Sequence, residues 1–180
     1  GEVLQLTAAQ NLATTEEIYL QVVRGKTAAL FAAACEVGGV IAGEPDAVSE
    51  ALRVYGDALG VSFQIVDDLL DYGGDADATG KNVGDDFRER KLTLPLIKAV
   101  AAADDEERAF WSRTIAKGKQ EGGDLDHALA LLERHGALAA TRADALGWSA
   151  RAKEALAPLP DGEIKALLVD LADYVVARIS

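Results

Sequence analysis

Three aspartates stand close together near the end of one apolar segment of this 180-residue chain, and they are the first candidates for chemistry. They are Asp67, Asp68 and Asp71, and the segment is 60–72. At about 100° of rotation per residue, a helix places the three carboxylates within an arc of roughly 100°. Phe, Ile, Val and Leu fill the rest of the circumference, which is typical of a helix buried on most sides. The acidic strip is therefore expected to face a wet cavity inside the molecule.

The crowding of these carboxylates predicts a bound cation. Three ionised carboxylates on one strip repel one another unless a cation lies among them. Ligands that are all oxygen, with no His or Cys nearby, favour a hard ion, Mg²⁺ before Ca²⁺. A merely solvated acidic face is the alternative, but aspartates at a helix C-terminus oppose the helix dipole. Mg²⁺ held by one or two carboxylates commonly completes its coordination with water and substrate phosphates.

Residues 73–93 form the longest stretch without a helical pattern, and they are rich in glycine. Lys81 and Lys91 fall in this stretch, and lysine is a compact positive charge for phosphate. A lid over a diphosphate is one interpretation. An ordinary solvated loop, whose lysines offset nearby aspartates, is the other. The stretch is not a P-loop, because no Ser or Thr follows Lys81.

Lys26 lies in an otherwise apolar helical stretch, 18–41, beside Thr27. Helical spacing places it on one face with Tyr19, Val23, Leu30, Ala33, Ala34 and Val37. A lysine on such a face is costly without a partner, and a bound anion at the mouth of an apolar groove is one solution. The alternative is a side chain that extends along the apolar surface to reach water.

Helical periodicity recurs along the whole chain and predicts an all-α protein. Helices are expected over 2–13, 16–42, 46–72, 94–103, 105–119, 124–135, 137–157 and 161–178.

Composition excludes several classes of function. The net charge is −12 and the pI is near 4.5, so a basic face that neutralises nucleic-acid phosphates is not expected. One cysteine excludes a disulfide scaffold and favours a reducing, cytoplasmic setting. No run of 18 uncharged apolar residues exists to cross a membrane. The chain contains no Met and starts like the interior of a helix, so we expect a piece of a longer protein.

The motifs taken together resemble one family, the trans-isoprenyl (polyprenyl) diphosphate synthases. Its second aspartate-rich region resembles 63–72, followed by Gly80-Lys81, Gly84-Asp85-Asp86 and 91–96. The pair Lys26-Thr27 resembles the family's Lys-Thr site. The tail resembles the long-chain bacterial branch that makes octaprenyl or decaprenyl diphosphate for quinones. The family's first aspartate-rich motif is absent, so the chain resembles a C-terminal half.

The resemblance implies a fold and a reaction. The fold is an isoprenoid synthase-type helical bundle around a central cavity, of which 1–180 would be the C-terminal part of a single domain. Its segments are the aspartate motif 63–72, the lid loop 73–93 and the C-terminal helices 94–180. The reaction is the condensation of isopentenyl diphosphate with an allylic diphosphate by a prenyltransferase, and the usual assembly is a homodimer.

The resemblance also assigns roles to the candidate residues. Asp67 would be the best ligand of Mg²⁺, with Mn²⁺ as a substitute, and Asp68 and Asp71 would lie close to the ion or bind it through water. The groups that hold the departing diphosphate would be Lys26, Lys81 and Lys91. Gln64 and Thr27 would lie beside the reacting carbons, with Lys26 as the third catalytic residue.

Two other functions remain as alternatives. One is a non-catalytic helical partner subunit of a heteromeric prenyl synthase, and the other is a terpene cyclase, whose Asn/Ser/Glu metal motif is not found. By itself the chain is expected to be inactive. Its apolar residues Leu4, Leu6, Val23 and Leu30 are expected to need cover from the missing N-terminal half.

Overall fold

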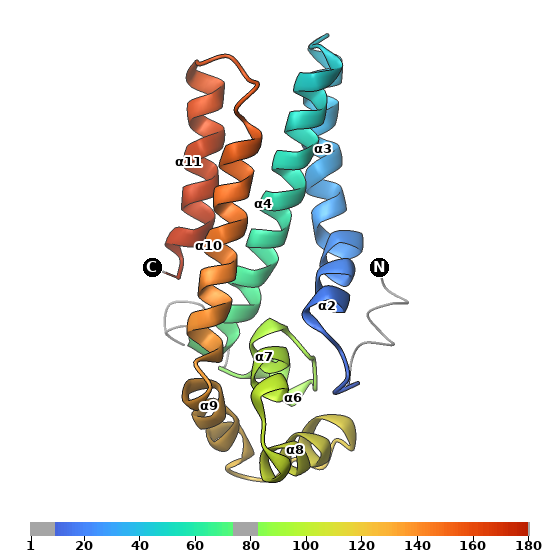
Figure 1. Cartoon of the computed structure of the whole chain (residues 1–180), viewed down its shortest axis with the longest axis vertical. Helices are drawn as coiled ribbons and strands as arrows, with labels where there is room; N and C mark the ends of the chain where they lie inside the picture. Colours follow the sequence, from blue (N-terminus) through green and yellow to red (C-terminus); the bar gives the residue numbers. More distant parts are fainter. Residues whose placement is uncertain (1–9, 74–82, 180) are drawn as a thin grey trace. The chain divides into compact units, whose positions relative to one another are not determined.

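A computed structural model describes residues 10–73 and 83–179, and every regular element within these ranges is helical (Figure 1). The all-α prediction is confirmed for this part of the chain. The elements are α2 (Glu16–Val23), η1 (Arg24–Ala28), α3 (Ala29–Ile41), α4 (Asp46–Gly73), α6 (Asp85–Arg88), α7 (Leu94–Ala102), α8 (Asp105–Trp111), η2 (Ser112–Ala116), α9 (Asp124–Arg134), α10 (Ala137–Ala155) and α11 (Glu163–Ala177). The η elements are π-helical turns.

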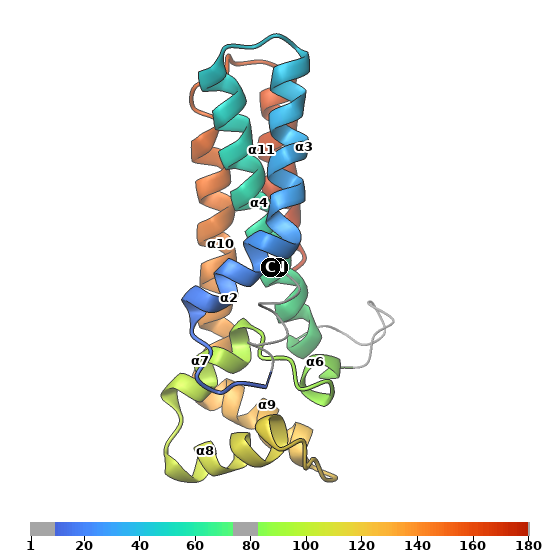
Figure 2. The ribbon, with the colours of Figure 1, turned by 90° about the vertical axis from the view of Figure 1, so that its right-hand side faces the viewer.

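The chain divides into two compact units. Of the described residues, the first unit comprises 23–66 and 143–179, and the second comprises 10–22, 67–73 and 83–142. In the first unit, α3, α4, α10 and α11 lie side by side (Figures 1 and 2). Buried or half-buried hydroxyls donate to backbone carbonyls of the neighbouring helices. The Tyr55 hydroxyl donates to the Leu168 carbonyl at 2.7 Å. The Ser62 and Ser149 hydroxyls donate to the carbonyls of Ala145 and Ala172, each at 2.9 Å.

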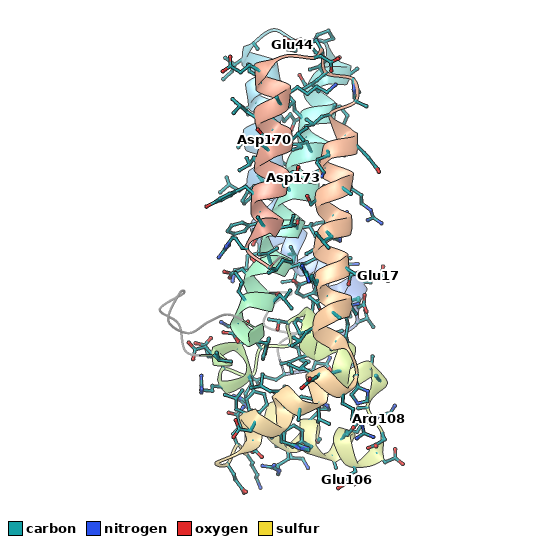
Figure 3. All side chains as sticks on the ribbon, turned by 90° about the vertical axis from the view of Figure 1, so that its left-hand side faces the viewer. Glu17, Glu44, Glu106, Arg108, Asp170 and Asp173 are labelled. Atoms are coloured by element: carbon teal, nitrogen blue, oxygen red, sulfur yellow. The ribbon has the colours of Figure 1, made fainter. Side chains whose placement is uncertain are left out.

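The first unit also presents exposed charge along α11 (Figure 3). Asp170 and Asp173 project from this helix, and Lys153 of α10 donates to Asp173 Oδ1 at 2.6 Å. Such exposed ion pairs contribute little to stability. The helix contacts of this unit are therefore held by apolar packing and by the hydroxyl–carbonyl bonds.

Two glycines of α4 allow the backbones of the first unit to approach closely. A Cβ at Gly56 would lie 2.5 Å from the Phe31 carbonyl oxygen, and one at Gly60 would lie 2.7 Å from Ala28 Cα. Real Cβ contacts of this length with backbone atoms do not occur, so a larger residue would push the helices apart. The contact of α4 with η1 and α3 therefore depends on glycine.

The second unit has an aromatic core. Trp111 is fully buried and its ring contacts those of Phe87 and Phe110 at 6.5 and 4.9 Å between centroids. At the start of α8, Asp104 and Glu107 form a capping box. The Glu107 carboxylate is buried and is also bonded to Arg134 and His135, at 2.7 and 2.8 Å.

Most predicted helices are confirmed within about two residues of their ends. Residues 10–13 are a turn instead of helix, because Asn11 Oδ1 accepts from Ala13 N–H and competes with helical bonding. The stretch 73–93 includes one helical turn, α6, which is too short to give a periodic signal. The predicted helix 16–42 is interrupted by η1.

Several large apolar side chains of the first unit are exposed on α3 and α11, including Leu30, Ile41 and Ile164 at 75, 81 and 74 %. The expectation of an uncovered Leu30 is confirmed, and the same expectation for Val23 is wrong because it is buried. Leu4 and Leu6 lie outside the described residues. Among the helices in the described ranges, none is both long enough and apolar enough to cross a membrane.

Replacing Gly56 by alanine is expected to destabilise the chain by about 1–3 kcal/mol, because its Cβ would meet backbone that cannot move aside. The measurement is the free energy of unfolding in denaturant. Gly38→Ala is the matched control, since a Cβ at Gly38 meets nothing within 4 Å; it should be neutral or stabilising. Equal stabilities of the two variants would contradict the close approach.

Candidate functional site

The aspartate-bearing end of α4 is buried on most sides, as the sequence predicts. Ile65 and Val66 are fully buried and Leu69 is 7 % exposed. On the acidic strip, Asp68 is only 6 % exposed, while Asp67 and Asp71 are half-buried. The three carboxylates therefore do not form an ordinary solvated face.

A tyrosine hydroxyl holds Asp68. Tyr19 of α2 donates to Asp68 Oδ2 at 2.6 Å, within the second unit. Burial raises the pKa of Tyr19 well above its usual value, and the negative charge of Asp68 raises it further. The phenol therefore stays a neutral donor. The sequence grouped Tyr19 with apolar residues, and its spacing gave no sign of this bond.

Backbone N–H groups from beyond the loop hold Asp71. Asp86 N–H donates to Asp71 Oδ2 at 3.0 Å, and Gly84 N–H donates to the Asp71 carbonyl at 2.8 Å. Gly84 has φ of +81°, a conformation that glycine adopts without strain. The chain thus returns to the end of α4 before α6 begins.

Asp86 is a fourth carboxylate at this place, and it was not predicted as a site residue. Burial raises its pKa to about 6, and the charges of Asp71 and Asp67 add to the rise. Lys91 opposes the rise, with Nζ at 3.3 Å from Asp86 Oδ1. The sequence feature that could have indicated Asp86 is the pair Asp85-Asp86, followed by Lys91 five residues later.

The lysines predicted to hold a diphosphate belong to different units or lie outside the described residues. Lys91 lies among the acidic groups of the second unit, since it also pairs with Glu89 at 2.5 Å. Lys26 is exposed on η1 of the first unit. Lys81 lies outside the described residues, so its predicted role stays a prediction.

The residues predicted to share a face with the exposed Lys26 differ in burial. Tyr19 and Val23 are buried, but Leu30 and the residues after it on that face are exposed. The cause is the π turn, in which Ala29 N–H donates to the carbonyl of Arg24, five residues earlier. A wider turn shifts every later side chain around the helix axis.

Thr27 and Gln64 are brought together in the first unit. The Thr27 hydroxyl donates to Gln64 Oε1 at 2.9 Å, across 37 residues of sequence. This pairing joins η1 to α4, one turn before Asp67 along the same helix. Thr27 and Gln64, the two residues that the resemblance places beside the reacting carbons, are therefore neighbours.

The described residues on their own do not enclose a metal ion. Within 10–73 and 83–179, no three His, Cys, Asp or Glu side chains form a group that could hold one. The donors at α4 are nevertheless carboxylate oxygens, the chemistry that Mg²⁺ prefers. An ion held by one or two carboxylates with water and phosphate oxygens fits this donor set.

The chain has a helical architecture shared with known synthases. It matches the family model described as "Polyprenyl synthetase" over residues 1–132. A solved polyprenyl synthase from Roseobacter denitrificans is 72 % identical, with a TM-score of 0.93 over 98 % of this chain and 58 % of that chain. The chain therefore belongs to the polyprenyl synthetase family, and the predicted family and fold class are confirmed.

Two further relatives are informative. An all-trans-nonaprenyl-diphosphate synthase (geranyl-diphosphate specific) of Rhodobacter capsulatus is 42 % identical over 99 % of this chain and 54 % of its own length. A polyprenyl synthase of Caulobacter crescentus, solved with calcium and isoprenyl diphosphate, is 46 % identical, with a TM-score of 0.92 over 99 % of this chain and 55 % of that chain. The chain spans about half the length of the relatives it matches.

The Thr27–Gln64 bond is expected to contribute about 0.5–1.5 kcal/mol of coupling energy, because it is half-buried and neutral. The measurement is a double-mutant cycle of unfolding free energies with Thr27→Val and Gln64→Ala. As a control, Thr27→Val is combined with Glu50→Gln, because the Glu50 carboxylate accepts from Arg53 and not from Thr27. Additive effects in both cycles would show that the bond contributes nothing.

Proposed function

We propose that this chain supplies the C-terminal part of a prenyltransferase site that condenses isopentenyl diphosphate with an allylic diphosphate to make long-chain polyprenyl diphosphate. The observation that carries the proposal is the fixed acidic strip of α4. Asp68 is held by Tyr19, and Asp71 is held by the N–H of Asp86. The relatives named as nonaprenyl-diphosphate synthase and polyprenyl synthase support the same reaction.

Residues of the strip would hold Mg²⁺, with Mn²⁺ as a substitute. Asp67 is the proposed direct ligand, and Asp68 and Asp71 would lie close to the ion or bind it through water. The ion supplies positive charge that offsets the charge developing on the departing diphosphate. The Caulobacter crescentus relative, solved with calcium and isoprenyl diphosphate, supports a divalent cation together with such a ligand.

The lysines bind the leaving group. Lys26, Lys81 and Lys91 are proposed to hold the diphosphate as the allylic carbon–oxygen bond breaks and its electron pair stays on the diphosphate oxygen. The double bond of isopentenyl diphosphate then forms the new carbon–carbon bond, and the released diphosphate accepts the proton that is lost. Thr27 and Gln64, bonded to each other, would border the reacting carbons. Excluding water protects the allylic cation.

The proposed partners complete this site. The rest of the longer protein would supply the first aspartate-rich motif, and the assembly would be a homodimer in the cytoplasm. The exposed apolar residues of α3 and α11 are consistent with surfaces that are covered in that protein. The 180 residues alone are expected to show no turnover.

A non-catalytic partner subunit is the competing function, and it is not favoured because the named relatives are synthases. Inorganic diphosphate with Mg²⁺ separates the two functions. Calorimetric titration of the longer protein should show binding that requires both components. A lack of binding with the whole protein present would favour the partner subunit.

Asp67→Ala in the longer protein is expected to lower turnover about 100-fold or more with little loss of stability, because charge stabilisation in the transition state is lost. Turnover is measured from labelled isopentenyl diphosphate at saturating Mg²⁺, and chelation with EDTA should abolish it. Asp105→Ala, at an exposed aspartate of α8, is the control and should be fully active. Unchanged turnover in Asp67→Ala would remove the metal assignment.

A further inference from the structure

The bond between Tyr19 and Asp68 gives the acidic strip a support that the sequence motif does not contain. We propose that Tyr19 is a positioning residue, whose hydroxyl orients the Asp68 carboxylate so that the strip can bind a divalent cation. This inference rests on the proposed function, because it concerns the same strip. It adds a residue from α2, 49 positions away in sequence, to that site.

The geometry of the bond is that of a strong hydrogen bond to a charged acceptor. The oxygen–oxygen distance is 2.6 Å, and charge-assisted O–H···O⁻ bonds fall near this length. Both side chains are 6 % exposed, so bulk water does not reach the pair freely. Removing the hydroxyl would leave a buried carboxylate with one donor fewer, which costs more than the loss of an exposed bond.

The position of the hydroxyl is set by the start of α2. Thr15 Oγ1 accepts from Ile18 N–H at 3.3 Å, which places the first turn, and Tyr19 N–H donates to the Thr15 carbonyl at 3.0 Å. Glu16 pairs with Lys98 of α7 at 2.8 Å. These contacts lie within the second unit and fix α2 relative to α7 (Figure 2).

The donor in this bond is a neutral hydroxyl, unlike the guanidinium groups that bond other aspartates of the chain. Two aspartates elsewhere pair with arginines: Asp57 with Arg24 at 3.2 Å, and Asp124 with Arg113 at 2.7 Å. An arginine partner orients a carboxylate but also offsets its negative charge. The phenol of Tyr19 carries no charge, so this bond orients the Asp68 carboxylate without itself adding positive charge.

The test compares two tyrosine hydroxyls in the longer protein. Tyr19→Phe should raise the Mg²⁺ concentration needed for half-maximal turnover by about tenfold, because groups that orient metal ligands commonly have effects of this size. Tyr55→Phe is the matched control, since the Tyr55 hydroxyl donates to a carbonyl of the first unit at 2.7 Å. It should shift Tm without changing the Mg²⁺ requirement. An unchanged Mg²⁺ requirement in Tyr19→Phe would overturn the inference.

A second variant shows whether Tyr19 acts through Asp68. Asp68→Asn should itself raise the Mg²⁺ requirement, and adding Tyr19→Phe to it should have no further effect. Independent, additive increases would overturn the positioning role. This comparison also distinguishes the positioning role from a general loss of packing. A loss of packing caused by Tyr19→Phe would raise the Mg²⁺ requirement in the wild type and in Asp68→Asn alike.

Direct binding separates failure of the inference from failure of the proposed function. Mn²⁺ binding is followed by electron paramagnetic resonance in the presence of inorganic diphosphate. If the wild type shows no metal-dependent turnover, the proposed function fails. Weaker Mn²⁺ binding in Tyr19→Phe than in Tyr55→Phe would still support the positioning role, and equal binding would overturn it.

Discussion

The repulsion among carboxylates at one end of a buried helix is the constraint on which the proposed site depends. Asp67, Asp68 and Asp71 follow one another on α4, and Asp86 joins them from α6. Burial raises the pKa of Asp86 to about 6, and the charges of Asp71 and Asp67 add to the rise. Hydrogen-bond donors orient these carboxylates, and a cation among them would relieve the repulsion.

Close packing of two backbones positions the part of α4 that carries Gln64. Gly60 lets α4 approach Ala28 so closely that a Cβ there would lie 2.7 Å from Ala28 Cα. Thr27 precedes Ala28, and its hydroxyl reaches Gln64 at 2.9 Å. The π turn that carries Lys26 and Thr27 is irregular backbone of a kind found often at functional sites. Gly60 on α4 and the π turn η1 together accompany the hydrogen bond between Thr27 and Gln64.

The sequence predicts the parts of this molecule that depend on local pattern. Periodicity defines long helices such as α4 and α11, and the acidic strip follows from three aspartates within five positions. It does not predict the bond from Tyr19 to Asp68, because the partners are 49 residues apart and tyrosine also fits an apolar face. The π turn is not predicted either, because the apolar spacing over 16–42 does not distinguish an α-helical turn from the wider turn at Arg24–Ala28.

The central claim is that the carboxylates of α4 bind a divalent cation together with a diphosphate. The most direct measurement is anomalous scattering from crystals of the longer protein grown with Mn²⁺ and an isoprenyl thiolodiphosphate. The account predicts an anomalous peak within coordination distance of an Asp67 carboxylate oxygen and of diphosphate oxygens. A bound diphosphate whose metal ions avoid Asp67, Asp68 and Asp71 would contradict it.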